Sequence, residues 1–169
     1  MVFDFYPWNL DVDVEGTRLL YRDNDYAGKR KVNERFWQAM SDGQKRFFHS
    51  LGVDFMRVEA DEKLYNIPDD GDVQGGGISM KTIHFLLHGS FLAIPDFQGE
   101  LYKDAEVFGS QVPDSLKIVR MPQEEALTVY EVDGWPCVFK HPCFHFEQEK
   151  LQKWNCGYLL GSILLMKDE

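Results

Sequence analysis

The chain has 169 residues, the length of one ordinary domain, and its composition is 44% hydrophobic, 14% aromatic and 27% charged. These values exclude a disordered, collagen-like or low-complexity chain, because enough apolar material is present to offset the entropy of ordering. The formal net charge of -10 opposes contact with a phosphate backbone, so we expect no direct nucleic-acid binding and a protein partner with a basic surface.

The N-terminal residues and the cysteines indicate in which cellular compartment the protein is expected. No basic segment followed by an apolar one opens the chain, and the longest apolar stretch, residues 158–166, is about half the roughly 20 residues that cross a bilayer. The three cysteines are odd in number and crowded into the last third of the chain, a poor basis for a disulfide framework. We therefore expect a cytoplasmic protein with reduced thiols and no membrane segment.

The first third of the chain predicts a hairpin followed by a capped helix. Residues 10–14 alternate polar and apolar, and residues 17–21 resume an apolar run after a Glu-Gly turn, which is typical of a hairpin. Residues 23–31 predict a loop. Ser41 and Gln44 have the spacing of a capping box, so a helix is expected to begin there and to end at Gly52.

The middle of the chain predicts a strand, a loop and a core helix. Residues 53–58 favour a strand, with a helix that continues to about residue 63 as the alternative. Residues 67–77 are too rich in Gly, Pro and Asp for anything but a loop. Five residues then recur at helical spacing: Met80, Ile83, His84, Leu87 and Phe91. This spacing predicts a buried helix that ends before Pro95.

The last third predicts strands. Residues 116–120 favour a short strand, and the runs 127–132 and 135–139 flank Asp133-Gly134, a dipeptide suited to a tight hairpin turn. Residues 146–166 fit either a helix or a strand. The expected fold is α+β, a single domain over residues 1–169 with two or three helices packed on a mainly antiparallel sheet. Six residues are expected in its core: Phe48, Leu51, Ile83, Leu87, Val129 and Phe139.

Four potential metal ligands lie on odd positions near the C-terminus: Cys137, His141, Cys143 and His145. In an extended chain their side chains would project from one face. Their spacing matches no common zinc motif, and adjacent extended residues rarely converge on one tetrahedral ion. We expect ordinary packing, with a metal site or a nucleophilic Cys143 beside a histidine as the alternatives.

The histidine pair at positions 84 and 88 has the spacing of two ligands on one helical face. A metalloprotease helix needs a glutamate directly after the first histidine, where this chain has Phe85. We therefore expect His84 to be a hydrogen-bonded core residue.

Two further patterns each lack one required residue. The glycine-rich residues 75–82 approach a phosphate-binding loop but have Met80 in place of a glycine. Residues 11–22 begin like a calcium loop but end on Arg22, where a bidentate glutamate is needed. We expect no tightly bound metal and no cofactor.

The charged residues are unevenly distributed along the chain, and the functional hypothesis is based on this distribution. Residues 29–46 hold six bases and two acids, whereas residues 59–72 hold six acids and one base. We expect these acids to form the edge of a partner-binding surface: Glu59, Asp61, Glu62, Asp69, Asp70 and Asp72.

The favoured function is a non-enzymatic binding protein whose acidic surface occupies a basic protein partner. In composition alone the chain is similar to small acidic immunity proteins that neutralise toxins, and to inhibitors that imitate nucleic acid. The alternatives are a small metal- or thiol-dependent enzyme that uses the Cys137 to His145 face, and a scaffold or complex subunit.

Overall fold

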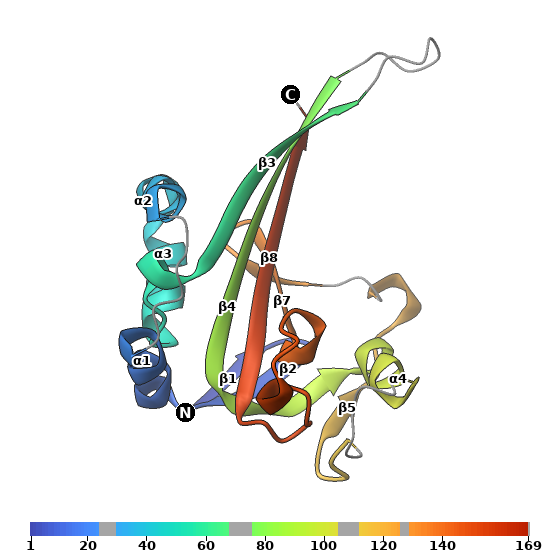
Figure 1. The fold of residues 1–169 in the computed structure, drawn as a ribbon. Coiled ribbons are helices and arrows are strands. Elements are labelled where there is room, and N and C mark those ends of the chain that lie inside the picture. The colour runs from blue at the N-terminus through green and yellow to red at the C-terminus, as the bar shows by residue number, and fades with distance from the viewer. Residues whose placement is uncertain (24–29, 68–75, 105–111, 126–128, 169) are drawn as a thin grey trace.

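The computed structural model describes residues 1–23, 30–67, 76–104, 112–125 and 129–168 (Figure 1). The fold is α+β, with four α-helices and an eight-stranded, mainly antiparallel sheet in this part of the chain. The helices are α1 (Val14–Asp23), α2 (Arg30–Ala39), α3 (Asp42–Ser50) and α4 (Asp96–Asp104). The strands are β1 (Val2–Phe5), β2 (Trp8–Val12), β3 (Glu59–Ile67), β4 (Gly76–Pro95), β5 (Lys117–Val119), β6 (Tyr130–Val132), β7 (Trp135–Lys140) and β8 (Tyr158–Asp168).

The 20-residue strand β4 organises the sheet, whose order is β1-β2-β4-β8-β7-β6. Along one edge, β4 pairs with β3 in its first half and with β2 in its second half, and along the other edge it pairs with β8. The strand β7 flanks β8 only over residues 160–163. The ends of β3, β4 and β8 therefore continue as a three-stranded ribbon (Figure 1). We call residues 62–67, 76–82 and 164–168 the distal arm.

The two faces of the sheet are covered differently. Odd residues of β4 point to the helices, where the ring of Phe85 lies 5.2 Å from that of Phe48 on α3. This ring also lies over Gly161 of β8, where a Cβ atom would collide with it. Even residues point to the opposite face, which we call the open face. Residues 141–157, which join β7 to β8, cover its lower part, and we call this segment the strap.

Several local predictions are confirmed. The helix α3 begins with a capping box in which Ser41 and Gln44 bond each other's backbone, and Gly52 follows it with a positive φ of 79°. A hairpin connects β6 and β7 through Asp133 and Gly134, both at positive φ, and β5 lies within the predicted strand 116–120. Five predicted core residues are fully buried: Phe48, Leu51, Ile83, Leu87 and Phe139. Val129 is only partly buried.

The predicted helix from Met80 is wrong, because these residues lie in β4. In its central part, alternate residues pack under the helices and under the strap, so both faces need apolar side chains. Phe85 and Leu86 are successive and both buried, at 1% and 3% exposure. A strand buried on both faces loses its two-residue alternation, and its apolar positions can then match a helical spacing by chance.

Three other local predictions are wrong. Residues 17–21 belong to α1, and the first hairpin instead joins β1 to β2. The helix α2 begins at Arg30, inside the predicted loop 23–31, of which residues 24–29 lie outside the described structure. Residues 53–58 form neither a strand nor a continued helix but contain a 3-10 helix, Phe55–Arg57. The ambiguous C-terminal segment ends in a strand, β8.

The predicted loop 67–77 lies outside the described structure over residues 68–75, and its flanking residues belong to β3 and β4. Among the described helices, none has the length and apolar character needed to cross a membrane.

Candidate functional site

The outer edge of β3 is the first feature of the candidate site. Among the described residues, β3 pairs with β4 alone, over nine residues from Glu59 to Ile67. Its other edge meets no strand of the described structure. We call this the free edge.

The backbone groups at the free edge can be assigned from β4. The carbonyl oxygens of Leu86 and His88 accept hydrogen bonds from the Tyr21 hydroxyl and the Asp13 N–H, at 3.0 and 2.8 Å. The N–H of Gly89, by contrast, donates to Gly157 beside β8, at 2.8 Å. Even residues of β4 therefore direct their backbone groups towards α1 and β3, because successive residues of a strand face opposite edges.

The same alternation fixes which residues of β3 face outward. The even residues of β4 are in register with Glu59, Asp61 and Lys63, which use their N–H and C=O groups to pair with β4. Ala60 and Glu62 lie between them, and Leu64 follows, so these three direct their backbone groups away from β4. Ala60 is only 3% exposed, so its outward groups are covered, and the free edge presents the N–H and C=O pairs of Glu62 and Leu64.

The acids predicted to bind a partner divide into two groups. Glu59, Asp61 and Glu62 lie on β3, at or next to the free edge. Asp69 and the two acids after it, at positions 70 and 72, lie outside the described residues.

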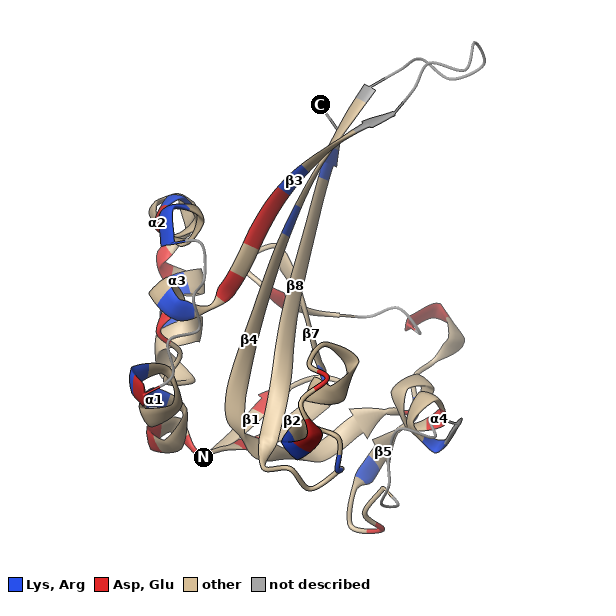
Figure 2. Cartoon of the chain, viewed as in Figure 1, with Lys and Arg blue, Asp and Glu red and all other residues tan. Residues whose placement is uncertain are grey.

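The three acids on β3 have basic partners nearby, which the sequence did not indicate (Figure 2). Glu62 pairs with Arg35 of α2 at 3.1 Å and with Lys81 of β4 at 3.2 Å. Asp61 pairs with Lys63 at 3.6 Å. These pairs are solvent-exposed to different degrees, so each contributes about 0–1 kcal/mol and leaves the carboxylates open to competition. The edge carries mixed charge, with acids at its centre.

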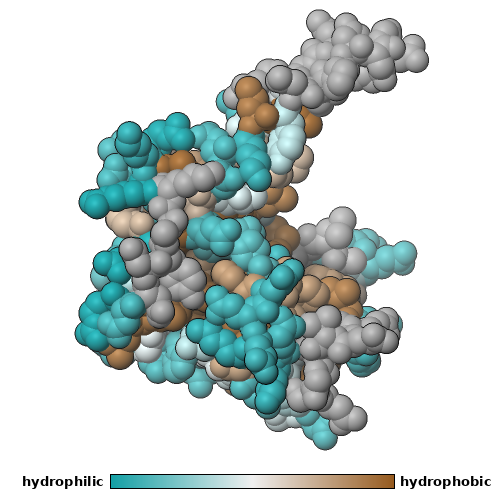
Figure 3. All heavy atoms as spheres, viewed as in Figure 1, coloured by the Kyte–Doolittle hydropathy of each residue, from teal (hydrophilic) through white to brown (hydrophobic). Residues whose placement is uncertain are grey.

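Large apolar side chains are exposed along the distal arm. Four of them are more than two-fifths exposed: Leu64 at 60%, Tyr65 at 46%, Leu164 at 47% and Met166 at 63%. The register places Tyr65, Leu164 and Met166 on the open face, beyond the reach of β7. Figure 3 shows hydrophobic residues reaching the surface along this arm. Apolar side chains gathered on an exposed strand ribbon mark a surface suited to binding another protein.

Contacts between polar side chains connect Glu59, the first residue of β3, to the strap and to β8. Glu59 bonds Nε2 of His145 at 2.9 Å, and the His145 ring stacks on that of His84, with 4.1 Å between centroids. The Nδ1 of His84 lies 2.9 Å from the hydroxyl of Ser162 on β8. Desolvation, followed by the charges of His145 and Lys140, lowers the pKa of His84 to about 4. His84 is therefore neutral at pH 7, and it is a hydrogen-bonded, partly buried residue on a strand.

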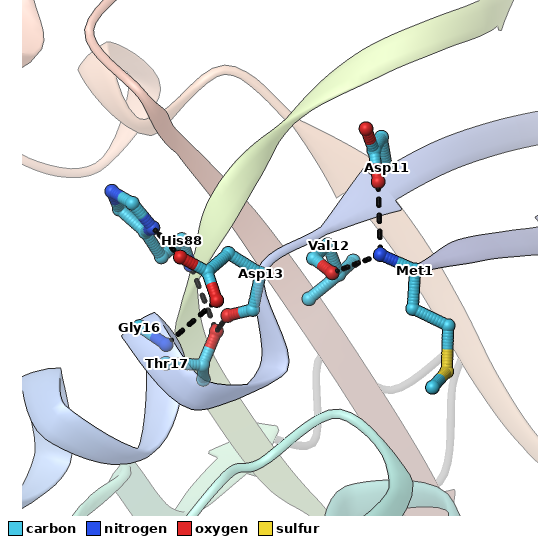
Figure 4. Close-up of polar contacts among 7 residues, drawn as sticks. All are labelled: Met1, Asp11, Val12, Asp13, Gly16, Thr17 and His88. Carbon is cyan, nitrogen blue, oxygen red and sulfur yellow. Dashed lines mark hydrogen bonds and ion pairs between the residues drawn. The ribbon is translucent and has the colours of Figure 1, made fainter.

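A second polar cluster fastens α1 to β4 (Figure 4). The carboxylate of Asp13 accepts from the N–H of Gly16 at 2.8 Å and lies 3.1 Å from Nδ1 of His88. The bond from Gly16, followed by that with His88, lowers the pKa of Asp13. Thr17 donates to the Asp13 carbonyl oxygen and accepts from the backbone N–H of His88, at 2.9 and 3.0 Å.

The cluster also resembles the orienting half of a general-base pair. Because a carboxylate only accepts, Asp13 holds the proton of His88 on Nδ1 and leaves Nε2 able to accept a proton. Among the described contacts, none joins this Nε2 to a hydroxyl or thiol nucleophile. The observed bonds serve to cap α1 and to anchor it on β4.

The four Cys and His residues near the C-terminus do not share one face. Cys137 lies on β7 within the core, fully buried, and burial raises its pKa. The strand ends at Lys140, and a 3-10 helix, Pro142–Phe144, turns the chain before His145. The chain is therefore not extended over all four positions, and the condition for a common face is not met.

The remaining members of this group have structural contacts. His141 is buried, its Nδ1 accepts from the Cys143 N–H at 3.2 Å, and its Nε2 lies 3.0 Å from the Lys153 carbonyl oxygen. Burial raises the pKa of Cys143 to about 11, with Cys156 as a further cause, so this thiol is protonated at neutral pH. Within the described residues, no three His, Cys, Asp or Glu side chains are placed to hold a metal ion.

No family model matches this sequence, and the searches of curated proteins and of solved structures found no match either.

Proposed function

We propose that this chain is a protein-binding protein that takes up an extended segment of a basic partner along the free edge of β3. The observation that carries the proposal is the pair of accessible residues Glu62 and Leu64, whose N–H and C=O groups point away from β4. An added strand would bond all of them, which is the mode of recognition called β-augmentation. Such an edge is usually shortened, bent or covered in proteins that do not use it.

The charge of β3 favours a different chain over a second copy of this one. If two β3 strands paired antiparallel about a twofold axis, one residue near the strand centre would lie opposite its own copy. At the central registers this residue is Asp61, Glu62 or Lys63, and like charges directly opposite each other are destabilising. A partner strand with basic residues opposite Glu59 and Asp61 would replace this repulsion with attraction.

The exposed apolar residues of the distal arm give the same partner a second contact. Tyr65, Leu164 and Met166 lie on the open face close to the end of the free edge, so a segment longer than the strand could fold over them. Backbone bonds would supply part of the affinity, and these side chains would supply specificity. A toxin-neutralising protein or an inhibitor is the class of function that this mode of binding suits.

The test uses a short synthetic peptide of alternating lysine and valine, titrated into the labelled protein while its backbone amide NMR signals are recorded. We expect the signals of Glu62 and Leu64 to shift in a saturable way. A peptide of alternating glutamate and valine is the matched control and should leave them in place. Equal shifts with both peptides, or shifts confined to other elements, would refute the proposal.

A proline substitution separates the free edge from the fold itself. Glu62→Pro removes an outward N–H, which makes no bond to β4, and proline is tolerated on the outer side of an edge strand. The variant should keep its circular dichroism spectrum and lose peptide binding. Glu62→Val, which keeps the N–H, is the control for the lost carboxylate and should retain the backbone contribution.

A further inference from the structure

A hollow lies on the helical side of the molecule, away from the free edge. It has a volume of about 550 Å³, within the roughly 300–1,000 Å³ range of small-molecule sites. It is bounded by α1, by Trp37 of α2 and by the residues from Gly52 to Arg57 that follow α3. Neither the free edge nor the distal arm contributes a side chain to it.

The lining of the hollow includes aromatic and aliphatic side chains. Trp37, Val53, Phe55 and Met56 line it, and the rings of Trp37 and Phe55 lie 5.9 Å apart. Phe55 is 2% exposed and supports the partly buried Trp37 from the core side. The ring of Trp37 is therefore the aromatic surface that a planar ligand would contact.

Three arginine residues line the same hollow: Arg18, Arg22 and Arg57. Arg18 and Arg22 are four residues apart on α1, and therefore on one helical face. Arg57 comes from the 3-10 helix and donates through Nη1 to the carbonyl oxygens of Tyr21 and Arg22, at 2.8 and 3.1 Å. These bonds fix Arg57 against the C-terminal end of α1 and bring it beside the other two arginines.

The residues that line the hollow carry a net positive charge, in contrast to the whole chain. They include three arginines and a single carboxylate, Asp54, in a protein with a formal net charge of -10. Arg57 pairs with Asp54 at 3.6 Å, whereas Arg18 and Arg22 pair with Glu15 and Asp23, which do not line the hollow. All three pairs are solvent-exposed, so a bound anion can compete for their guanidinium groups at little cost. Like charges four residues apart on a helix destabilise it slightly, and a bound anion would offset that repulsion.

We propose that this hollow binds a small aromatic organic anion, with its ring against Trp37 and its carboxylate, sulfonate or phosphate group among the three arginines. A guanidinium group offers paired N–H donors that match such oxyanions, and these charge-assisted bonds are the strong ones. The aromatic wall selects for a flat ring, and the arginines select for its charge. The site is separate from the free edge, so binding at one does not depend on the other.

The experiment titrates the protein with 1-anilinonaphthalene-8-sulfonate, a fluorescent aromatic sulfonate, and with the uncharged N-phenyl-1-naphthylamine as the matched probe. We expect saturable binding of the sulfonate and weaker binding of the neutral probe. In the double variant R18Q/R22Q, affinity for the sulfonate should fall about tenfold or more, because charge-assisted bonds are lost. Affinity for the neutral probe should stay the same.

Two further variants make the result specific. R46Q/R120Q removes two exposed arginines that do not line the hollow and should leave sulfonate binding unchanged. Trp37→Leu should weaken both probes while the circular dichroism spectrum and the unfolding midpoint show a folded protein. Equal sulfonate affinity in the wild type and R18Q/R22Q, or equal loss in R46Q/R120Q, would overturn the proposal.

Discussion

The imidazole of His145 on the strap stacks on that of His84 on β4, with 4.1 Å between ring centroids. His145 also bonds Glu59, the first residue of the free edge, and His84 bonds Ser162 of β8. Two stacked imidazoles cannot both be protonated without direct repulsion. A proton on His84 would place its charge directly against the His145 ring, so these contacts favour the neutral form of His84.

The first prediction concerns pH and stability. The pKa of His84 is lowered from 6.5 to about 4 in the folded chain, chiefly by burial. Below pH 6.5 the unfolded chain binds a proton at this residue that the folded chain does not. The free energy of unfolding should therefore fall as the pH is lowered from 6.5 towards 4.

A histidine variant isolates this contribution. His84→Gln can keep a hydrogen bond to Ser162 but does not titrate, so its urea midpoint should fall less steeply over the same pH range. His49→Gln, at an exposed position of α3, should retain the slope of the wild type. An identical slope for wild type and His84→Gln would show that His84 titrates normally.

The second prediction concerns the cap of α3. The Ser41 hydroxyl accepts from the Gln44 N–H at 3.1 Å and lies 2.6 Å from the carboxylate of Asp133, at the β6–β7 turn. Ser41→Ala should lower the free energy of unfolding by about 1 kcal/mol, measured by urea denaturation. Ser50→Ala at the other end of the helix is the control and should cost less. An equal loss of unfolding free energy in the two variants would contradict a stabilising role of the Ser41 cap.

The third prediction concerns the core. Leu87 is fully buried on β4, and Leu87→Ala should cost about 2–5 kcal/mol through the cavity it leaves. Leu19 is 38% exposed on α1, so Leu19→Ala should cost clearly less in the same denaturation experiment. An unchanged midpoint for Leu87→Ala would contradict the packing of β4 against the helices.

The fourth prediction concerns charge at the free edge. Reversing Glu59 and Asp61 to Lys should weaken binding of the lysine–valine peptide strongly at low salt. The difference should shrink near 1 M salt, where screening acts over about 3 Å. Glu62 is left unchanged because it also pairs with Arg35 and Lys81. If neither the charge reversal nor the salt concentration changes the affinity for the peptide, Glu59 and Asp61 are not part of the interface.

Sequence reasoning located the elements that are defined by a few adjacent residues. The α3 cap and the turn at Asp133 and Gly134 depend on local hydrogen bonds and backbone angles, which neighbouring residues determine. The burial pattern of β4 depends on the elements that cover its two faces, and these elements cannot be identified from neighbouring residues in the sequence. The sequence does not predict helix α1, because a Glu-Gly pair is typical of a turn, whereas Gly16 lies in the first turn of the helix, beside the capping carboxylate of Asp13.

The candidate site was predicted only in part for the same reason. The run of acids that includes Glu59, Asp61 and Glu62 was visible in the sequence, and the structure places these three on one edge strand. Their partners Arg35 and His145 lie 27 or more positions from them, so only the tertiary structure brings them together. The free edge itself follows from strand order, which the sequence did not reveal.

Amide hydrogen exchange along β3 tests the central claim most directly. In the free protein, Glu62 and Leu64 should exchange fast, whereas Asp61 and Lys63, bonded to β4, should exchange slowly. Saturation with the lysine–valine peptide should slow the two fast amides, because an added strand accepts their hydrogens. Fast exchange that the bound peptide leaves unchanged, or slow exchange at both residues in the free protein, would contradict a partner strand at this edge.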